Sequence, residues 1–210
     1  MLATGDIRTL KPAQIDALRE VANIGAGHAA TALSTMIGRE IMITVPTLTL
    51  ARLTQVPAHV VADESAQVAV VLLHVLGDLT GRSLLVFPTP TAFRLAELLL
   101  RRPRGSSASI GLLEQSALKE CGNILCGAYL NALSDFMHLI LLPSPPSLAV
   151  DAANTVLSPA FLGEATQELQ VICVESAFQL RDDGSELRGY FLLLPDAGSL
   201  TTLLGAINRA

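Results

Sequence analysis

Two pairs of polar residues, Glu20 with Asn23 and Glu120 with Asn123, lie 100 positions apart in this 210-residue chain. Shifting the sequence by 100 places residues 14–35 over the later segment without a gap, and nine of these 22 positions are identical. A carboxylate and a carboxamide are hydrogen-bonding groups that can bind water, cations or other polar ligands. The chain therefore contains an internal repeat in which the same two functional groups recur at the same spacing.

Each pair falls on a polar ridge of a predicted helix. At about 100° per residue, positions 16, 20 and 23 lie within about 60° of one another and to one side of the apolar stripe. That stripe consists of Ile15, Leu18, Ala22, Ala29 and Leu33. A single pair of this kind is best explained as a solvated helix flank. Solvation does not require the same pair twice, whereas neighbours such as Val21 and Cys121 differ between the repeats. Both pairs are therefore candidate functional residues.

Two glycines, Gly27 and Gly127, are also repeated. A glycine in the middle of a helix costs about 1 kcal/mol relative to alanine. The small neighbours Ala26, Ala29 and Ala128 favour a structural explanation. We expect another part of the backbone to approach the helix closely at each glycine.

The sequence lacks the usual arrangements of several enzyme classes. Ser34 and Ser134 recur, but no His/Asp set accompanies them and no G-x-S-x-G motif is present. The four histidines are scattered and form no H-E-x-x-H metal motif. We find neither a P-loop nor an arginine clamp for phosphate. These absences disfavour a serine hydrolase, a metalloprotease of the H-E-x-x-H kind and a P-loop enzyme.

A dinucleotide-binding enzyme is a rival interpretation. Residues 25–30 read G-x-G-x-x-A, which is part of a dinucleotide-binding fingerprint. That fingerprint must follow a strand and open a helix, but here it lies inside a helical pattern that begins near Leu10. Leu125 also replaces its first glycine in the repeat. This interpretation is disfavoured, and a nicotinamide-binding titration would test it.

The hydrophobic periodicity predicts two similar halves joined by a basic, Pro/Gly/Ser-rich linker at residues 101–109. In the first half we expect a helix at 10–37, strands at 41–50, 67–76 and 82–87, and a helix at 91–101. In the second half we expect a helix at 110–137, an extended segment ending at 148–150, a short helix near 153–162, strands at 169–178 and 187–194, and a helix at 196–208. Pro46 cannot donate to a sheet ladder, so its strand should lie at a sheet edge or bend there.

The predicted fold class is α/β of the α+β kind. Two pseudo-twofold related α-β-β-β-α repeats, about residues 10–102 and 110–209, would share one sheet, with the two long motif-bearing helices side by side. Each repeat is too small to close a core comfortably by itself. We therefore expect a single domain that spans residues 1–210.

Composition limits the partners and the location. Hydrophobic residues make up 50% of the chain and charged residues 16%, which excludes general disorder. Gly and Pro interrupt every long apolar stretch, and the N-terminus has no secretory signal, so we expect a cytoplasmic protein without a membrane segment. A net charge of −5 without a basic stripe disfavours nucleic acid and favours a partner with exposed Lys or Arg. The three cysteines are expected to be free, buried thiols.

Each half also fits the pattern D/S-x3-E-x2-N-x22-P. The matching residues are Asp16, Glu20, Asn23 and Pro46 in the first half and Ser116, Glu120, Asn123 and Pro146 in the second. This pattern resembles the signature of the CheC, CheX and FliY phosphatases of bacterial and archaeal chemotaxis, and two copies in one chain resemble CheC most. The segments NIGAGHAATALS, GNILCGAYLNALS and PSPPSLAVD are similar to CheC as well.

The resemblance implies an enzyme that hydrolyses the aspartyl phosphate of the response regulator CheY. A receiver domain carries its own Mg²⁺ and Lys beside the acyl phosphate, so the phosphatase needs no cofactor of its own and has to supply an aligned water. In this interpretation Asn23 and Asn123 position the water, much as a Gln does in GTPases, while Glu20 and Glu120 pair with the receiver's Lys. In the same interpretation, Asp16 and Ser116 lie at the edge of the interface with the receiver. Pro46 and Pro146 shape the strand beside each helix.

The resemblance also implies a second partner. CheC-like proteins bind the receptor deamidase CheD, and a member could act chiefly as a regulator of CheD with secondary phosphatase activity. We expect such contacts in residues 147–156, which include Asp151, although the alternative is an ordinary strand end that leads into a short helix. A flagellar switch component like FliY is disfavoured because nothing follows Ala210, and a monomer is expected.

Overall fold

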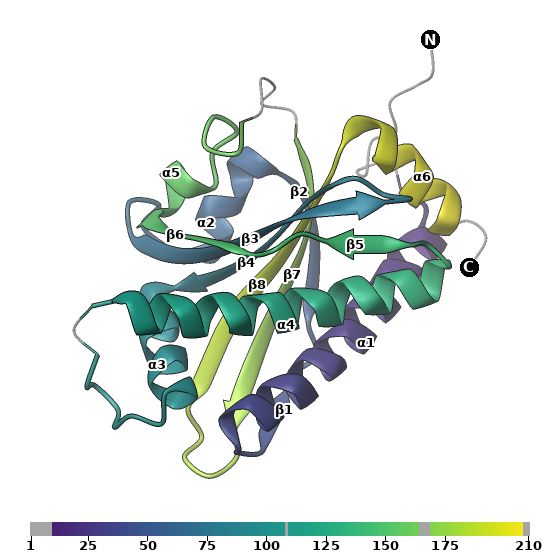
Figure 1. Ribbon diagram of the computed structural model, residues 1–210. Coiled ribbons are helices and arrows are strands. Elements are labelled where there is room, and N and C mark those ends of the chain that lie inside the picture. The colour runs from purple at the N-terminus through teal and green to yellow at the C-terminus, as the bar shows by residue number, and fades with distance from the viewer. Residues whose placement is uncertain (1–9, 108, 164–168, 208–210) are drawn as a thin grey trace.

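The computed structural model describes residues 10–107, 109–163 and 169–207 (Figure 1). The helices are α1 (Pro12–Ile37), α2 (Val56–Val60), α3 (Thr89–Leu99), α4 (Leu112–Met137), α5 (Ala153–Val156) and α6 (Ala197–Ile207), and a short 3-10 helix, η2 (Leu53–Gln55), precedes α2. The strands are β1 (Ile41–Ile43), β2 (Thr47–Arg52), β3 (Gln67–Gly77), β4 (Gly81–Pro88), β5 (Leu141–Pro143), β6 (Ser147–Ala152), β7 (Gln170–Leu180) and β8 (Glu186–Pro195). Within these described ranges, no helix is long and apolar enough to cross a membrane.

The strands form one eight-stranded sheet in the order β1-β7-β8-β4-β3-β5. β2 continues the edge beside β7, and β6 continues the opposite edge beside β3. Each half therefore gives its edge strands to the other half: β1 and β2 pair with β7, whereas β5 and β6 pair with β3. The prediction that two related halves share one sheet is confirmed.

The two exchanged edges have the same register. Thr47 of β2 pairs with Glu175, the sixth residue of β7, and Ser147, 100 positions after Thr47, pairs with Leu72, the sixth residue of β3. A one-residue slip would turn every side chain of an edge strand to the wrong face of the sheet. Identical registers at both edges therefore place the two halves in equivalent surroundings, which extends the sequence repeat into three dimensions.

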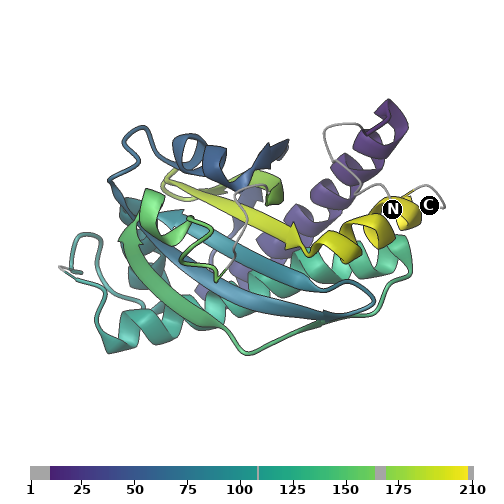
Figure 2. The ribbon, with the colours of Figure 1, turned by 90° about the horizontal axis from the view of Figure 1, so that it is seen from above.

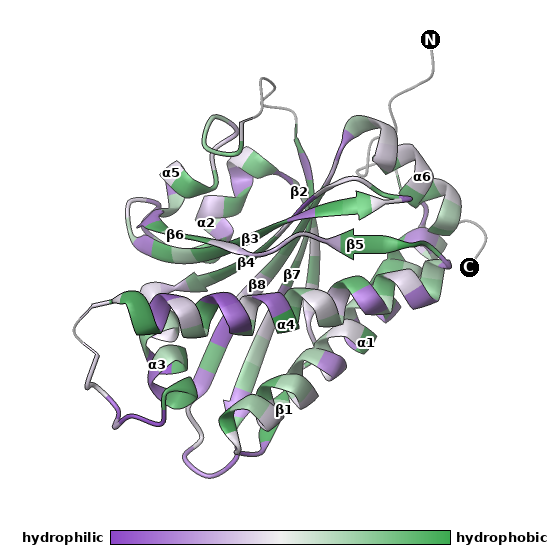
Figure 3. Cartoon of the chain, in the orientation of Figure 1, coloured by the Kyte–Doolittle hydropathy of each residue, from purple (hydrophilic) through white to green (hydrophobic). Residues whose placement is uncertain are grey.

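Helices cover both faces of the sheet (Figures 1 and 2). α1 and α4 pack side by side on one face, as predicted, and α2 and α5 lie together against the other (Figure 1). Adjacent strand residues alternate between the two layers, so Leu85 joins the larger core under α1 and α4, and Leu84 joins the smaller core under α2 and α5. The central strands are consequently apolar along much of their length (Figure 3).

Pro46 separates the two parts of the first edge strand. β1 ends at Ile43 and β2 begins at Thr47, so the single strand predicted at 41–50 is two short strands. Both expectations for this proline are met, because the strands lie at the sheet edge and the pairing with β7 is interrupted there. The second half has the same interruption between β5 and β6, around Pro146.

Several short elements differ from the prediction. η2 and α2 were not predicted from the sequence, and α5 ends at Val156 rather than near residue 162. α3 begins at Thr89, two residues earlier than expected, with Pro90 in its first turn. Proline is tolerated there because the first N–H groups of a helix have no intrahelical partner. Helices of one turn carry too little periodicity to be recognised from sequence.

The repeated serines lie where the long helices end. Ser34 Oγ accepts a hydrogen bond from the N–H of Ile41 at 3.1 Å, and Ser134 Oγ donates to the carbonyl of Leu139 at 2.5 Å. In both halves the residue that directly follows the helix has a left-handed backbone conformation, with φ of 73° at Gly38 and 54° at His138. Ser34 and Ser134 therefore connect each helix to the strand that follows, which explains why both halves contain them without a catalytic role.

Candidate functional site

The first ridge, defined as Asp16, Glu20 and Asn23 of α1, faces solvent. All three residues are exposed because the opposite side of the helix buries Leu18 and Ala22 in the larger core. Among the residues that the structure describes, neither Glu20 nor Asn23 forms a side-chain hydrogen bond or ion pair. Their carboxylate and carboxamide groups are therefore available to a ligand.

The second ridge, defined as Ser116, Glu120 and Asn123 of α4, has the same arrangement. Ser116 and Glu120 are exposed and Asn123 is half-buried, whereas Leu118 and Cys121 point into the larger core. Glu120 and Asn123 likewise have no side-chain hydrogen bond or ion pair within the described ranges. Each half thus presents one carboxylate and one carboxamide from a rigid helix.

Asp16 forms an ion pair with Arg19 on the first ridge. The Arg19 Nη1 to Asp16 Oδ1 distance is 3.0 Å, and the two side chains are 62% and 69% exposed. An exposed pair of this kind contributes about 0.2–1 kcal/mol at most, so it orients Arg19 more than it stabilises the fold. Ser116 replaces Asp16 in the second half and cannot form such a pair with Lys119. The surroundings of the two ridges therefore differ in charge.

A shallow hollow adjoins the first ridge. Its volume is about 270 Å³, and it lies between α1 and the turn that connects β1 to β2. The lining residues are Arg19, Asn23, Val45, Pro46, Thr47 and Leu48. The structure thus brings together Asn23 and Pro46, which have 22 residues between them in the sequence pattern. Arg19 was not predicted as a site residue, although its spacing of four from Asn23 was a visible signal.

The expectation for Gly27 and Gly127 is wrong. An added Cβ atom at either glycine would meet no heavy atom within 4 Å, so no other backbone approaches them. The close contacts occur at glycines that the two halves do not share. A Cβ on Gly25 would lie 2.6 Å from Cδ1 of Tyr129 on α4, and one on Gly122 would lie 2.6 Å from side-chain carbons of Val71. The two unshared glycines therefore allow α1 and α4 to pack closely on each other and on the sheet.

The cysteines are free and buried, as predicted. Burial raises the pKa of Cys126 and of Cys173 to about 12, and it raises that of Cys121 further, so these thiols stay protonated at neutral pH. Within the described parts of the chain, no group of three or more His, Cys, Asp or Glu residues could hold a metal ion.

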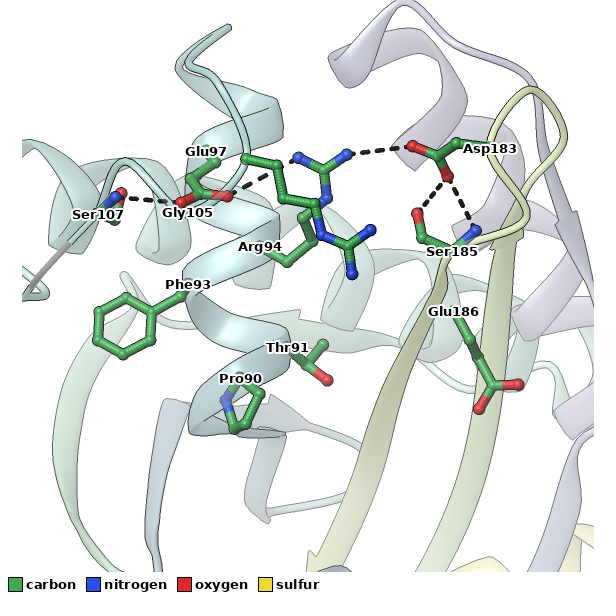
Figure 4. Close-up of a pocket in the computed structure, with 11 residues that line it drawn as sticks. Pro90, Thr91, Phe93, Arg94, Glu97, Gly105, Ser107, Asp183, Ser185 and Glu186 are labelled. Atoms are coloured by element: carbon green, nitrogen blue, oxygen red, sulfur yellow. Dashed lines mark hydrogen bonds and ion pairs between the residues drawn. The ribbon is translucent and has the colours of Figure 1, made fainter.

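A larger hollow of about 470 Å³ lies between α3 and the turn that joins β7 to β8 (Figure 4). Three of its ionic groups, Arg94, Glu97 and Asp183, form a chain of ion pairs. Arg94 lies 3.3 Å from Asp183 and 3.8 Å from Glu97, and Asp183 also accepts hydrogen bonds from Ser185 and Arg39. This hollow contains no residue of the repeated pattern, and its charges tie α3 and the end of α1 to the β7–β8 turn.

Burial of Glu97 by itself would raise the pKa of this carboxyl group. Hydrogen bonds from the backbone of residues 105–107 and the nearby Arg94 outweigh burial, so the pKa of Glu97 is lowered. Glu97 is therefore an ionised group that organises the loop between α3 and α4.

Asp151 is exposed on the edge strand β6, and its Oδ1 accepts a hydrogen bond from the N–H of Ala152 at 2.7 Å. It lies away from both ridges along the chain and in a different element. The structure therefore does not bring Asp151 together with the Glu and Asn residues.

A family model and a relative of known function point to the same protein family. The CheC-like family model matches residues 14–50 and 113–150, and each match runs from a ridge helix into the exchanged edge strands. "CheY-P phosphatase CheC" of Bacillus subtilis is 32% identical over 203 residues, which are 96% of this chain and 97% of that protein. The chain belongs to the CheC-like family.

Other CheC-like relatives match as well. The flagellar motor switch phosphatase FliY of Bacillus subtilis is 28% identical over 143 residues, which cover 67% of this chain and 36% of that protein. The crystal structure of Thermotoga maritima FliY superposes with a TM-score of 0.75 at 24% identity and covers 96% of this chain and 98% of that one. This likeness supports the CheC-like fold described above.

Proposed function

We propose that this CheC-like protein dephosphorylates the response regulator CheY at two sites, one on each ridge. The observation that carries the proposal is the recurrence, at the same helical spacing in both halves, of an exposed Glu and a solvent-accessible Asn whose side chains have no partner among the described residues. The 32% identity to a CheY-P phosphatase over nearly the whole chain supports the same activity. The substrate is then an aspartyl phosphate on the surface of another protein.

The reaction needs one water molecule in line with the phosphoryl group. Its oxygen attacks phosphorus, the bond between phosphorus and the aspartyl oxygen breaks, and the products are inorganic phosphate and a free carboxylate on CheY. Asn23 or Asn123 holds this water, since the Oδ1 atom accepts a hydrogen bond from it and fixes its direction without any change of protonation state. The Mg²⁺ and Lys of the receiver stabilise the charge on the transferring group.

Glu20 and Glu120 set the docking position. Each lies one helical turn before its Asn, and each carboxylate is free to pair with the receiver's Lys. Asp16 and Ser116, a further turn back, contact the edge of the receiver. Pro46 and Pro146 act indirectly, because each interrupts an edge strand beside its ridge helix.

The first prediction concerns the two carboxamides. Asn23→Ala together with Asn123→Ala removes the water-positioning group from both sites, and the loss of one such group raises the barrier by about 2–4 kcal/mol. Release of phosphate from phosphorylated CheY should therefore fall by about 30- to 900-fold. Each single variant should retain about half of the turnover, because the other ridge still works.

Asn154→Ala is the matched control, since Asn154 is an exposed carboxamide on α5, which lies against the face of the sheet opposite to α1 and α4. This variant should hydrolyse phosphorylated CheY at the wild-type rate, and circular dichroism should show the same helix content in every variant. Wild-type turnover by the double Asn variant would refute the mechanism.

CheD is a second partner that we propose. The exposed Asp151 on edge strand β6 is compatible with a contact outside the two ridges. Titrating CheD into the CheY assay with wild type and Asp151→Asn would separate the roles. If CheD binds at β6, the variant should lose the CheD effect and keep its phosphatase activity.

A further inference from the structure

The ridge helices contain four glycines, and the structure explains only two of them. Gly25 and Gly122 are required by contacts inside the protein, with Tyr129 and with Val71. The other half has Leu125 and Ala22 at the corresponding positions, so these two glycines are solutions to local packing. The two glycines that internal contacts explain are therefore not shared by the two halves.

Gly27 and Gly127 show the opposite behaviour. Both halves contain this glycine, although open space surrounds the position of a Cβ atom in each. Both lie inside a long α-helix, where glycine is less favourable than alanine, and neither has a positive φ that would require it. The chain itself supplies no reason for these two glycines.

The positions of Gly27 and Gly127 on their helices supply a reason for these glycines. Around an α-helix, position 27 falls between positions 20 and 23, within about 60° of both, and lies about one turn beyond Asn23. Gly127 has the same relation to Glu120 and Asn123. Each ridge therefore continues beyond its Asn to a glycine, where the helix surface consists of backbone without a side chain.

We propose that Gly27 and Gly127 are gaps in the two docking surfaces, over which the main chain of the phosphorylated receiver passes. This inference rests on the proposed function. Because glycine has no side chain, a partner backbone can approach the helix more closely there than at any other residue type. The close approach brings the phosphoryl group within reach of the water held by Asn23 or Asn123, and displacement by about 1 Å can slow such a reaction by about 100-fold.

The test uses the full-length double variant Gly27→Ala with Gly127→Ala. Alanine is the better helix former and has room for its methyl group in the free protein, so each substitution should raise the Tm by about 2–4 °C. The methyl groups should also displace the receiver, so kcat/KM for phosphorylated CheY should fall by about 10- to 100-fold. Calorimetry should also show that the double variant binds more weakly than wild type to CheY activated with beryllofluoride and Mg²⁺.

Two controls separate docking from helix stability. Gly198→Ala fills another helical position with open space, on α6 and outside both ridges, so it should not lower kcat/KM. His28→Ala changes an exposed residue next to Gly27 that lies about 80° from Glu20 around the helix, and it should leave kcat/KM unchanged.

Two results would overturn the inference. One is a double glycine variant with wild-type kcat/KM and wild-type affinity for activated CheY. The other is a lower Tm, which would show that the glycines serve packing inside the protein. Failure of the proposed function looks different, since wild-type turnover would then survive in the double Asn variant. If the Asn variant is inactive and the glycine variant is fully active, the proposal about Gly27 and Gly127 is refuted and the proposed function is not.

Discussion

At the scale of single residues, the proposed chemistry depends on groups that need no special environment. Asn23 and Asn123 work in a neutral form, and Glu20 and Glu120 are exposed carboxylates. A nucleophile or general base would need burial or a charged neighbour to adjust its pKa. The site can therefore lie on an open helix surface, provided that a partner supplies the metal ion and the positive charge.

A second prediction at this scale concerns Gly122. A methyl group there would lie 2.6 Å from the Cβ and both Cγ atoms of Val71, a branched side chain on a paired strand that cannot swing away. Gly122→Ala should therefore lower the free energy of unfolding by about 1–3 kcal/mol, as overpacked cores do. Urea titration would measure this change, and Gly127→Ala on the same helix is the control with the opposite expected sign. Equal stability of Gly122→Ala and wild type would contradict the described helix–sheet contact.

At the scale of elements, ion pairs attach the β7–β8 turn to the helices. Arg39, just after α1, donates to Asp182 at 2.7 Å and to Asp183 at 2.8 Å, and Arg94 of α3 lies 3.3 Å from Asp183. Hydrogen bonds from Ser185, followed by the contact with Arg39, hold the pKa of Asp183 well below its ordinary value of 3.8. The corresponding turn of the first half is attached differently, through hydrogen bonds between Thr80 and Ser199 of α6.

The pH dependence of this attachment is the third prediction. A carboxyl group with a lowered folded pKa stabilises the fold above its unfolded pKa, and the contribution is lost as the pH falls through the folded pKa. The Tm of wild type should therefore exceed that of Asp183→Asn at pH 7, and the difference should shrink below pH 3.8. Thermal melts between pH 7 and pH 2 would measure it, with the exposed Asp135→Asn as control. A difference that grows as the pH falls would have the wrong sign.

At the scale of the whole molecule, exchange of the edge strands makes each half depend on the other. β1 and β2 of the first half find their hydrogen-bonding partners on β7, and β3 offers its outer edge to β5 and β6. The larger core also collects residues from both halves, including Leu33 of α1 and Leu133 of α4. Both ridges are therefore held by a scaffold that neither repeat can complete.

The fourth prediction follows from this exchange. A chain of residues 1–104 should fail to fold as a monomer, because its edge strands have no partner and its half of the core is open. At low concentration it should show no cooperative urea transition by circular dichroism, whereas the full chain should unfold in one transition. An isolated half that unfolds cooperatively as a monomer would show that the repeats are separate domains, contrary to the single domain expected for residues 1–210.

The repeat, the two long helices, an edge or a bend at Pro46 and the polar residues of both ridges could be predicted from the amino-acid sequence alone. These are local properties, since helical periodicity, proline chemistry and the spacing of Glu and Asn all act within a few turns of one chain segment. The three-dimensional fold was needed to learn which half each edge strand joins, that Asn23 and Pro46 line one hollow, and which helix glycines touch another element. Those features depend on contacts between residues far apart in the chain, and no local pattern records which distant atoms will fill, or leave empty, the space beside a given residue.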